Sequence, residues 1–263
     1  MFGSKLNYES HFYLAERELS GVNSIDIKYQ NAANVVNPLG YKKGVTTIGG
    51  PTSQTVSLSR SLLFIDPLLD YTGANHIVTG SFNYNNNASY GFNSGYLTSY
   101  SVNCAVGSIP KINASLVVYD EMRSGVNASG AVTQAIFIPS QGSITATCDN
   151  TTTNRVVGFD YSLEVARKPY YTVGAETPVE VKYISPIKYT ASVQLEVDDV
   201  FLESGYSFLT TGKEEKSVSF NINGRDGTAL QSLTIPKASL VGEQISASAD
   251  GSVRLTLNYI GHS

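Results

Sequence analysis

Short strand-like segments in the first half of this chain recur, in the same order, in its second half. The four matches pair residues 24–29 with 178–183, 56–60 with 193–197, 78–83 with 216–221, and 112–119 with 252–259. Any two β-strands alternate similarly, so the preserved order carries more weight than each match. A chain that contains one fold twice is typical of rings and arrays, because duplication supplies surfaces and not a unique pocket.

Alternation of apolar and polar residues with period two dominates the chain and predicts a mainly β fold. The 17 tyrosines and 23 glycines, with many Asn, Ser and Thr, fit strands joined by tight turns. Helical patterns are confined to residues 60–69 and 197–202, at equivalent places in the two halves, and to one turn near residues 237–241. We therefore expect two tandem β-sandwich or partial-barrel domains, each with one short helix.

The stretch 120–130 is rich in Gly, Ser and Asn and predicts the connection between the domains, which we place at 1–130 and 131–263. Between the first two matched segments, the first half has 17 more residues than the second. The excess falls in residues 30–54, which predicts a long loop that the second domain lacks. This loop is either a solvated hairpin or an arm that packs on a neighbouring subunit, and its apolar content favours the arm.

Charge is sparse, and the net charge of −4 falls in residues 131–263. Without a basic stripe, specific nucleic-acid binding is not expected. The N-terminal residues lack the apolar run of a secretory signal, and no segment approaches the length of a membrane-spanning helix. We expect Cys104 and Cys148 to be buried, reduced thiols of a protein made in the cytoplasm, since a disulfide framework would need more cysteines.

No catalytic motif is recognisable in the sequence, although a Ser-His-Asp arrangement stays open, because one sequence does not show which residues meet. The three histidines have no second ligand at metal-binding spacing, and no nucleophile-elbow or phosphate-binding glycine motif occurs. An acidic cluster is the best metal candidate, but a solvated acidic face is the favoured interpretation; it consists of Glu196, Asp198, Asp199 and Glu203. We therefore expect no enzyme activity, no cofactor and no metal.

Four tyrosines near residues 83–87 offer a second binding hypothesis, because aromatic rings stack on sugar rings. They are Tyr84, Tyr90, Tyr96 and Tyr100. The competing interpretation places these tyrosines at strand edges and subunit interfaces.

Three stretches carry a family resemblance. They are residues 50–69, residues 91–110, and residues 159–174 with Pro186 and Ile187 after them. Their pattern of strand and turn residues resembles that of the tail tube proteins of tailed bacteriophages. The likeness touches both halves and about a third of the chain.

The resemblance implies small tube-like β domains whose inner sheets join side by side around a ring. Stacked rings would form a DNA conduit through which DNA passes without specific binding. A duplicated domain implies three chains per ring, a pseudo-hexamer, within a virion tail assembled in the host cytoplasm. Residues 30–54 match the family's inter-ring stacking loop in position. Its expected contact residues are Leu39, Tyr41, Lys42, Lys43, Val45 and Ile48.

Other functions remain open at this level. The chain could be another tail ring with the tube fold, such as a baseplate hub or distal tail protein, or a head decoration protein. A carbohydrate-binding or adhesin module is the alternative from a different class, and it depends on the Tyr/Asn-rich stretch 82–100.

Overall fold

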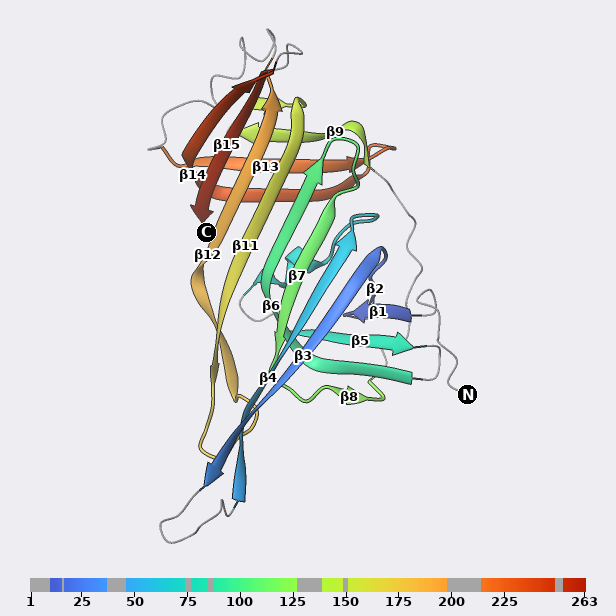
Figure 1. The fold of residues 1–263 in the computed structure, drawn as a ribbon, viewed down its shortest axis with the longest axis vertical. Coiled ribbons are helices and arrows are strands. Elements are labelled where there is room, and N and C mark those ends of the chain that lie inside the picture. Colours follow the sequence, from blue (N-terminus) through green and yellow to red (C-terminus); the bar gives the residue numbers. More distant parts are fainter. Residues whose placement is uncertain are drawn as a thin grey trace.

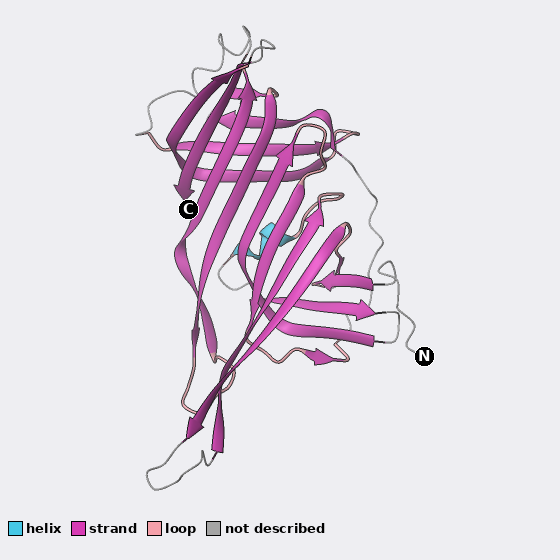
Figure 2. Ribbon diagram, in the orientation of Figure 1, coloured by secondary structure: helices cyan, strands magenta, loops and turns pink. Residues whose placement is uncertain are grey.

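The computed structural model describes residues 10–15, 17–36, 46–73, 77–84, 88–126, 139–148, 151–197, 214–248 and 253–263. These residues form a mainly β fold, as predicted. They build one large antiparallel sheet that is bent but not closed into a barrel, with a single short 3₁₀ helix (Figures 1 and 2).

Among the described residues, the first repeat contains eight strands and the helix. They are β1 (Ser10–Leu14), β2 (Arg17–Glu18), β3 (Val22–Val36), β4 (Thr46–Ser61), η2 (Leu68–Thr72), β5 (Val78–Tyr84), β6 (Ala88–Ala105), β7 (Lys111–Val118) and β8 (Arg123–Ser124). The second repeat follows. It consists of β9 (Pro139–Cys148), β10 (Thr151–Thr153), β11 (Val156–Tyr170), β12 (Glu180–Glu196), β13 (Lys216–Gly224), β14 (Ala229–Ala247) and β15 (Val253–His262).

The two repeats have the same strand order. The first runs β2-β1-β5-β6-β7-β4-β3, and the second runs β10-β9-β13-β14-β15-β12-β11. Each strand of the first repeat except β8 therefore has a counterpart in the second. The alternation of buried and exposed residues along strands such as β7 and β13 explains why the sequence forms them: one face of each strand lies on the core.

Three register shifts of the first repeat have counterparts in the second. The β3–β4 pairing shifts between Val22 and Ser24, and the β11–β12 pairing shifts between Val156 and Gly158. In the β5–β6 pairing the shift lies at Val78/Gly80, and in the β13–β14 pairing it lies at Lys216/Val218. In the β6–β7 pairing it lies at Leu97/Ser99, and in the β14–β15 pairing it lies at Leu240/Gly242. Bulges disrupt a ladder at defined positions, so they allow the repeats to be aligned residue by residue.

This alignment corrects part of the sequence prediction. Phe82 and Phe220 each lie two residues beyond the corresponding shift, so their predicted equivalence holds. Ile27 corresponds to Tyr161 and not to Val181. The sequence pattern assigns residues 179–183 and 193–197 to two different strands, but both segments belong to the β12 region. Regular alternation along one long strand produces such a false match.

The predicted difference between the two loops is wrong as well. β3 and β4 form one long hairpin, and β11 and β12 form an equivalent one, with connections 37–45 and 171–179 of equal length. Most of residues 30–54 are therefore strand and not loop. Both hairpins extend beyond the rest of the sheet as two arms (Figure 1).

The helix predictions also change. β4 continues to Ser61, and helix η2 begins only at Leu68, after Pro67. The turn expected near residues 237–241 is part of strand β14. The helix expected at residues 197–202 falls almost entirely outside the described residues, as does the domain boundary at residue 130.

Each repeat folds its sheet over an apolar core. The first part of β6 pairs with β5, whereas its last part pairs with β7 and β11. The strand is bent, so it belongs to both layers of the first repeat. In Figure 1, β1 and β5 run across the direction of β3, β4 and β7. Buried side chains such as Phe12, Phe92 and Leu97 form part of the core.

Candidate assembly surface

The residues predicted to act as a site are only partly described. Leu39, Tyr41, Lys42, Lys43 and Val45 lie outside the described residues, and Ile48 is placed only through its backbone pairing with Asn34. Glu196 is exposed at the end of β12, whereas Asp198, Asp199 and Glu203 lie outside the described residues. Within the described ranges, no three His, Cys, Asp or Glu residues are grouped as metal ligands.

The tyrosine platform of the alternative sugar-binding hypothesis is not assembled. Tyr96 and Tyr100 are buried, and the Tyr100 hydroxyl donates a hydrogen bond to Asp66 Oδ2 at 2.9 Å. Tyr90 is exposed, and the side chain of Tyr84 is not described. Tyrosines whose rings belong to the core cannot stack on a ligand.

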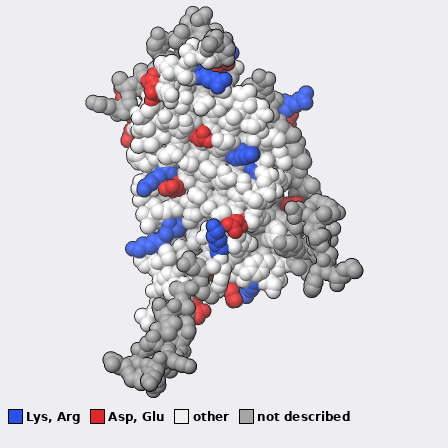
Figure 3. Space-filling model, in the orientation of Figure 1, with Lys and Arg blue, Asp and Glu red and all other residues white. Residues whose placement is uncertain are grey.

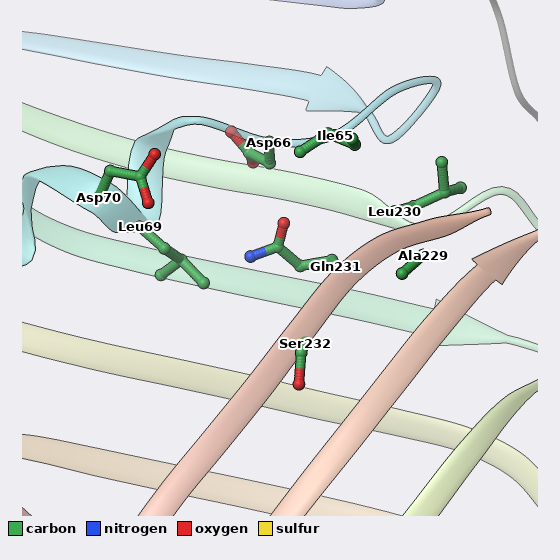
Figure 4. A pocket seen from close by; sticks show the side chains of 8 residues that line it. All are labelled: Ile65, Asp66, Leu69, Asp70, Ala229, Leu230, Gln231 and Ser232. Atoms are coloured by element: carbon green, nitrogen blue, oxygen red, sulfur yellow. The ribbon is translucent and has the colours of Figure 1, made fainter.

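A cavity of about 310 Å³ lies between helix η2, with the segment before it, and the start of β14 (Figure 4). Asp66 and Asp70 line one side, and Leu230 and Gln231 line the other. The Asp66 carboxylate is already engaged: besides Tyr100, it accepts a hydrogen bond from the Leu68 amide at 3.0 Å. The cavity therefore brings together two carboxylates but no nucleophile with a base.

Asp66 belongs to a buried polar cluster with Arg60 and Tyr100. Arg60 Nη1 lies 3.7 Å from Asp66 Oδ1, and both side chains are almost fully buried. Within the described part of the chain, the Arg60 nitrogens make no hydrogen bond. Burial raises the pKa of Asp66, with Arg60 acting in the opposite direction, and burial together with Asp66 raises the pKa of Tyr100 well above its ordinary value. This cluster is structural, since it lies beneath the surface.

Another candidate surface is one side of eight adjacent strands, in the order β14-β15-β12-β11-β6-β7-β4-β3. We call them the eight-stranded layer and its solvent side the polar face. One rung of paired residues crosses all eight strands from β3 to β14. It contains Ser24, Ser59, Asn113, Ser101, Ser162, Thr190, Ile260 and Ser239.

Hydroxyl and amide groups thus dominate the polar face. Ser162 Oγ and Thr190 Oγ1 lie 2.6 Å apart, within hydrogen-bonding distance across two strands. The next rung contains Asp26 and Glu164 but also Lys188, so charges of both signs occur together. In the orientation of Figure 1, charged side chains are scattered over a largely uncharged surface (Figure 3).

The two repeats join through β6 and β11, which pair from Ser99–Glu164 to Ala105–Gly158. Asn103 Nδ2 donates a hydrogen bond to Asp160 Oδ1 on this junction. The junction is a continuous antiparallel ladder, so the repeats share one sheet.

Arg167 fastens the junction at the base of the second arm. Its guanidinium donates hydrogen bonds to the carbonyl oxygens of Gly73 at 3.0 Å and Leu97 at 3.3 Å, both in the first repeat. It also lies 5.8 Å from the ring centroid of Tyr96 and 5.6 Å from that of Tyr183. Sequence reasoning missed this residue, because nothing in its sequence neighbourhood marks an arginine that links the two repeats.

The two outer strands of the eight-stranded layer have free edges. Among the described residues, β3 pairs only with β4, and the last part of β14 pairs only with β15. Strand β3 is the counterpart of β11, and β14 is the counterpart of β6. Within the chain, β11 and β6 pair with each other. An open sheet edge is a template for pairing with another strand.

Comparison with known proteins gives no assignment. No family model matches the chain, and no curated protein matches it significantly. Among the described residues, no helix is long and apolar enough to cross a membrane.

Proposed function

We propose that this protein is a tail tube subunit of a tailed bacteriophage, a non-enzymatic virion protein whose stacked rings form a DNA conduit. The observation that carries the proposal is the eight-stranded layer, which has one polar face, one face on the core and two free edges. Repetition of such a layer around an axis would give a hollow barrel with the polar face toward the lumen.

The chemistry of the polar face suits a passage for DNA. Tight binding to DNA requires Lys and Arg that neutralise several phosphates. Here Lys28 has Asp26 beside it on the same strand, with 3.4 Å between the charged groups. Rungs of Ser, Thr and Asn offer weak, exchangeable hydrogen bonds instead of a cationic surface. DNA would therefore contact the wall without being held.

The size of the layer favours three chains per ring. With a strand spacing of about 4.8 Å and a tilt of about 40°, 24 strands close into a barrel roughly 45–50 Å across at the backbone. That width leaves a lumen wide enough for double-stranded DNA after the inward side chains are allowed for. Six chains would double the diameter. Three duplicated chains make a pseudo-hexameric ring.

The two arms supply the proposed contacts between rings. The arm β11–β12 exposes apolar side chains near its connection, including Val173 and Val179. Since both repeats have an arm of equal length, we extend the stacking role from residues 30–54 to residues 171–179. Thr52 on the first arm donates a backbone hydrogen bond to Glu176 on the second at 3.2 Å, so the arms lie together.

Negative-stain microscopy of the purified protein tests the proposal. We expect rings or tubes with three-fold symmetry. Rings that never stack would favour another tail ring, such as a baseplate hub or distal tail protein. Monomers at all concentrations, or rings of six chains, would contradict the tube assignment in this form.

A further inference from the structure

The junction between the repeats shows how one copy of this chain fits the next. Within the chain, β6 of the first repeat pairs with β11 of the second. By the bulge alignment, β14 is the counterpart of β6 and β3 is the counterpart of β11. The same junction can therefore form again between the free β14 edge of one copy and the free β3 edge of another.

We propose that β3 of one subunit pairs antiparallel with residues 242–247 of β14 in the neighbouring subunit, in the register of the β6–β11 junction. In this register Ile27 lies opposite Ile245, as Tyr161 lies opposite Val102. Asp26 then lies opposite Ser246, and Lys28 opposite Gln244. The inference rests on the proposed ring and specifies its subunit interface.

Burial shows that the two free edges lack the cover that their counterparts have. Val102 and Leu163 are 1% and 2% exposed at the internal junction. Their counterparts Ile245 and Tyr29 are 64% and 54% exposed. Exposed apolar side chains along two open edges are an aggregation liability unless a strand covers them.

The partner is a second copy because the two edges are complementary and not identical. An edge that paired with itself would give a two-fold dimer, whereas β3 and β14 give a head-to-tail contact that closes into a ring when the rotation allows it. The side chains agree with the register. At the internal junction the Asp160 carboxylate accepts a hydrogen bond from Asn103. In the proposed interface its counterpart Asp26 lies opposite Ser246, whose hydroxyl can also donate. Both charged residues of this part of β3, Asp26 and Lys28, would face neutral polar partners.

Cysteine cross-linking of the full chain tests this register. The test variant carries Lys28→Cys and Gln244→Cys, two exposed positions that correspond to the directly paired Ser162 and Ser101. The variant Ser101→Cys/Ser162→Cys is the positive control and should form a disulfide within one chain. The variant Lys28→Cys/Glu243→Cys is the matched negative control, because a shift of one residue points the side chain to the other face of the sheet.

Under mild oxidation at concentrations where rings are seen, we expect the test variant to give covalent dimers and trimers on non-reducing gels, at least tenfold more than the negative control. Rings without this cross-link, or equal cross-linking in the negative control, would overturn the proposed interface but would not contradict the tube function. Specific cross-linking into open chains without rings would support the interface and overturn the tube function. Neither rings nor cross-links would overturn both.

Discussion

Phe159 of β11 stacks on Phe220 of β13, with ring centroids 5.1 Å apart and ring planes 4° from parallel. Both side chains are almost fully buried. The stack joins the eight-stranded layer to the strands that cross behind it, so it fixes the two layers of the second repeat against each other.

Replacement of Phe220 by Ala should lower the free energy of unfolding by about 3–5 kcal/mol, because it leaves a cavity under Phe159. Urea unfolding followed by circular dichroism measures this loss. Val173→Ala is the control, since Val173 is fully exposed and should change stability by less than about 0.5 kcal/mol. A loss below about 1 kcal/mol for Phe220→Ala would show that the layers are not held by this stack.

The ring of Phe92 lies against two glycines. A Cβ atom built on Gly80 or Gly95 would come within 2.5 Å of the ring. In the second repeat the positions of Phe92, Gly80 and Gly95 hold Ile235, Val218 and Ala238. A side chain smaller than Phe therefore lies against two residues larger than Gly. Gly80→Val alone should therefore cost about 1–3 kcal/mol of stability through overpacking.

The triple variant Phe92→Ile/Gly80→Val/Gly95→Ala should recover most of that loss, because it copies the combination that the second repeat uses. Thermal or urea unfolding of the single, double and triple variants gives the coupling energy. Additive losses would show that the two repeats pack differently at this point.

The buried pair Arg60–Asp66 should behave asymmetrically. Asp66→Ala leaves the Arg60 charge buried without its carboxylate and should cost about 3–5 kcal/mol. The counterpart of Arg60 in the second repeat is Leu195, which is fully buried. The double variant Arg60→Leu/Asp66→Ala should therefore be more stable than Asp66→Ala alone, as measured by urea unfolding. A double variant less stable than the single one would contradict this.

Arg167 should hold the two repeats together. Arg167→Lys keeps the charge but loses the planar fork that reaches several carbonyl oxygens, and we expect a loss of about 2 kcal/mol. Limited proteolysis should then cut more readily between the repeats. Lys168→Ala is the neighbouring control, since Lys168 is exposed and its Nζ lies 5.4 Å from the centroid of the Tyr170 ring, within the second repeat. Equal effects of the two variants would argue against a clamp.

Cys104 and Cys148 are both buried and lie outside any disulfide, and they should be unreactive in the folded protein. Burial raises the pKa of the Cys104 thiol to about 11, so on the order of one thousandth of it is thiolate at pH 8. Disulfide exchange with Ellman's reagent at pH 8 should be slow until urea unfolds the chain. Raising the pH toward 11 should speed the reaction of Cys104 while the fold persists. Immediate reaction at pH 8 would show that the thiol is not shielded.

The sequence by itself determined the fold class and the existence of the repeat. Alternation with period two is a local property, because successive side chains of a strand point to opposite faces, and it marked β7 and β13 clearly. The same periodicity could not determine register. Every second position along the 17-residue strand β12 looks alike, so the sequence pattern pairs Ile27 with Val181 and predicts an insertion where two equal arms exist.

Only the tertiary structure decided which strands are neighbours. The equivalence of β3 with β11 and of β6 with β14 depends on pairing between segments far apart in the chain, and the bulges that fix it leave no clear local signal. The burial of Tyr100 over Asp66, the clamp of Arg167 and the two free edges follow from the same long-range pairing. These features depend on what each strand meets across the sheet, and a single strand's sequence does not encode its partner.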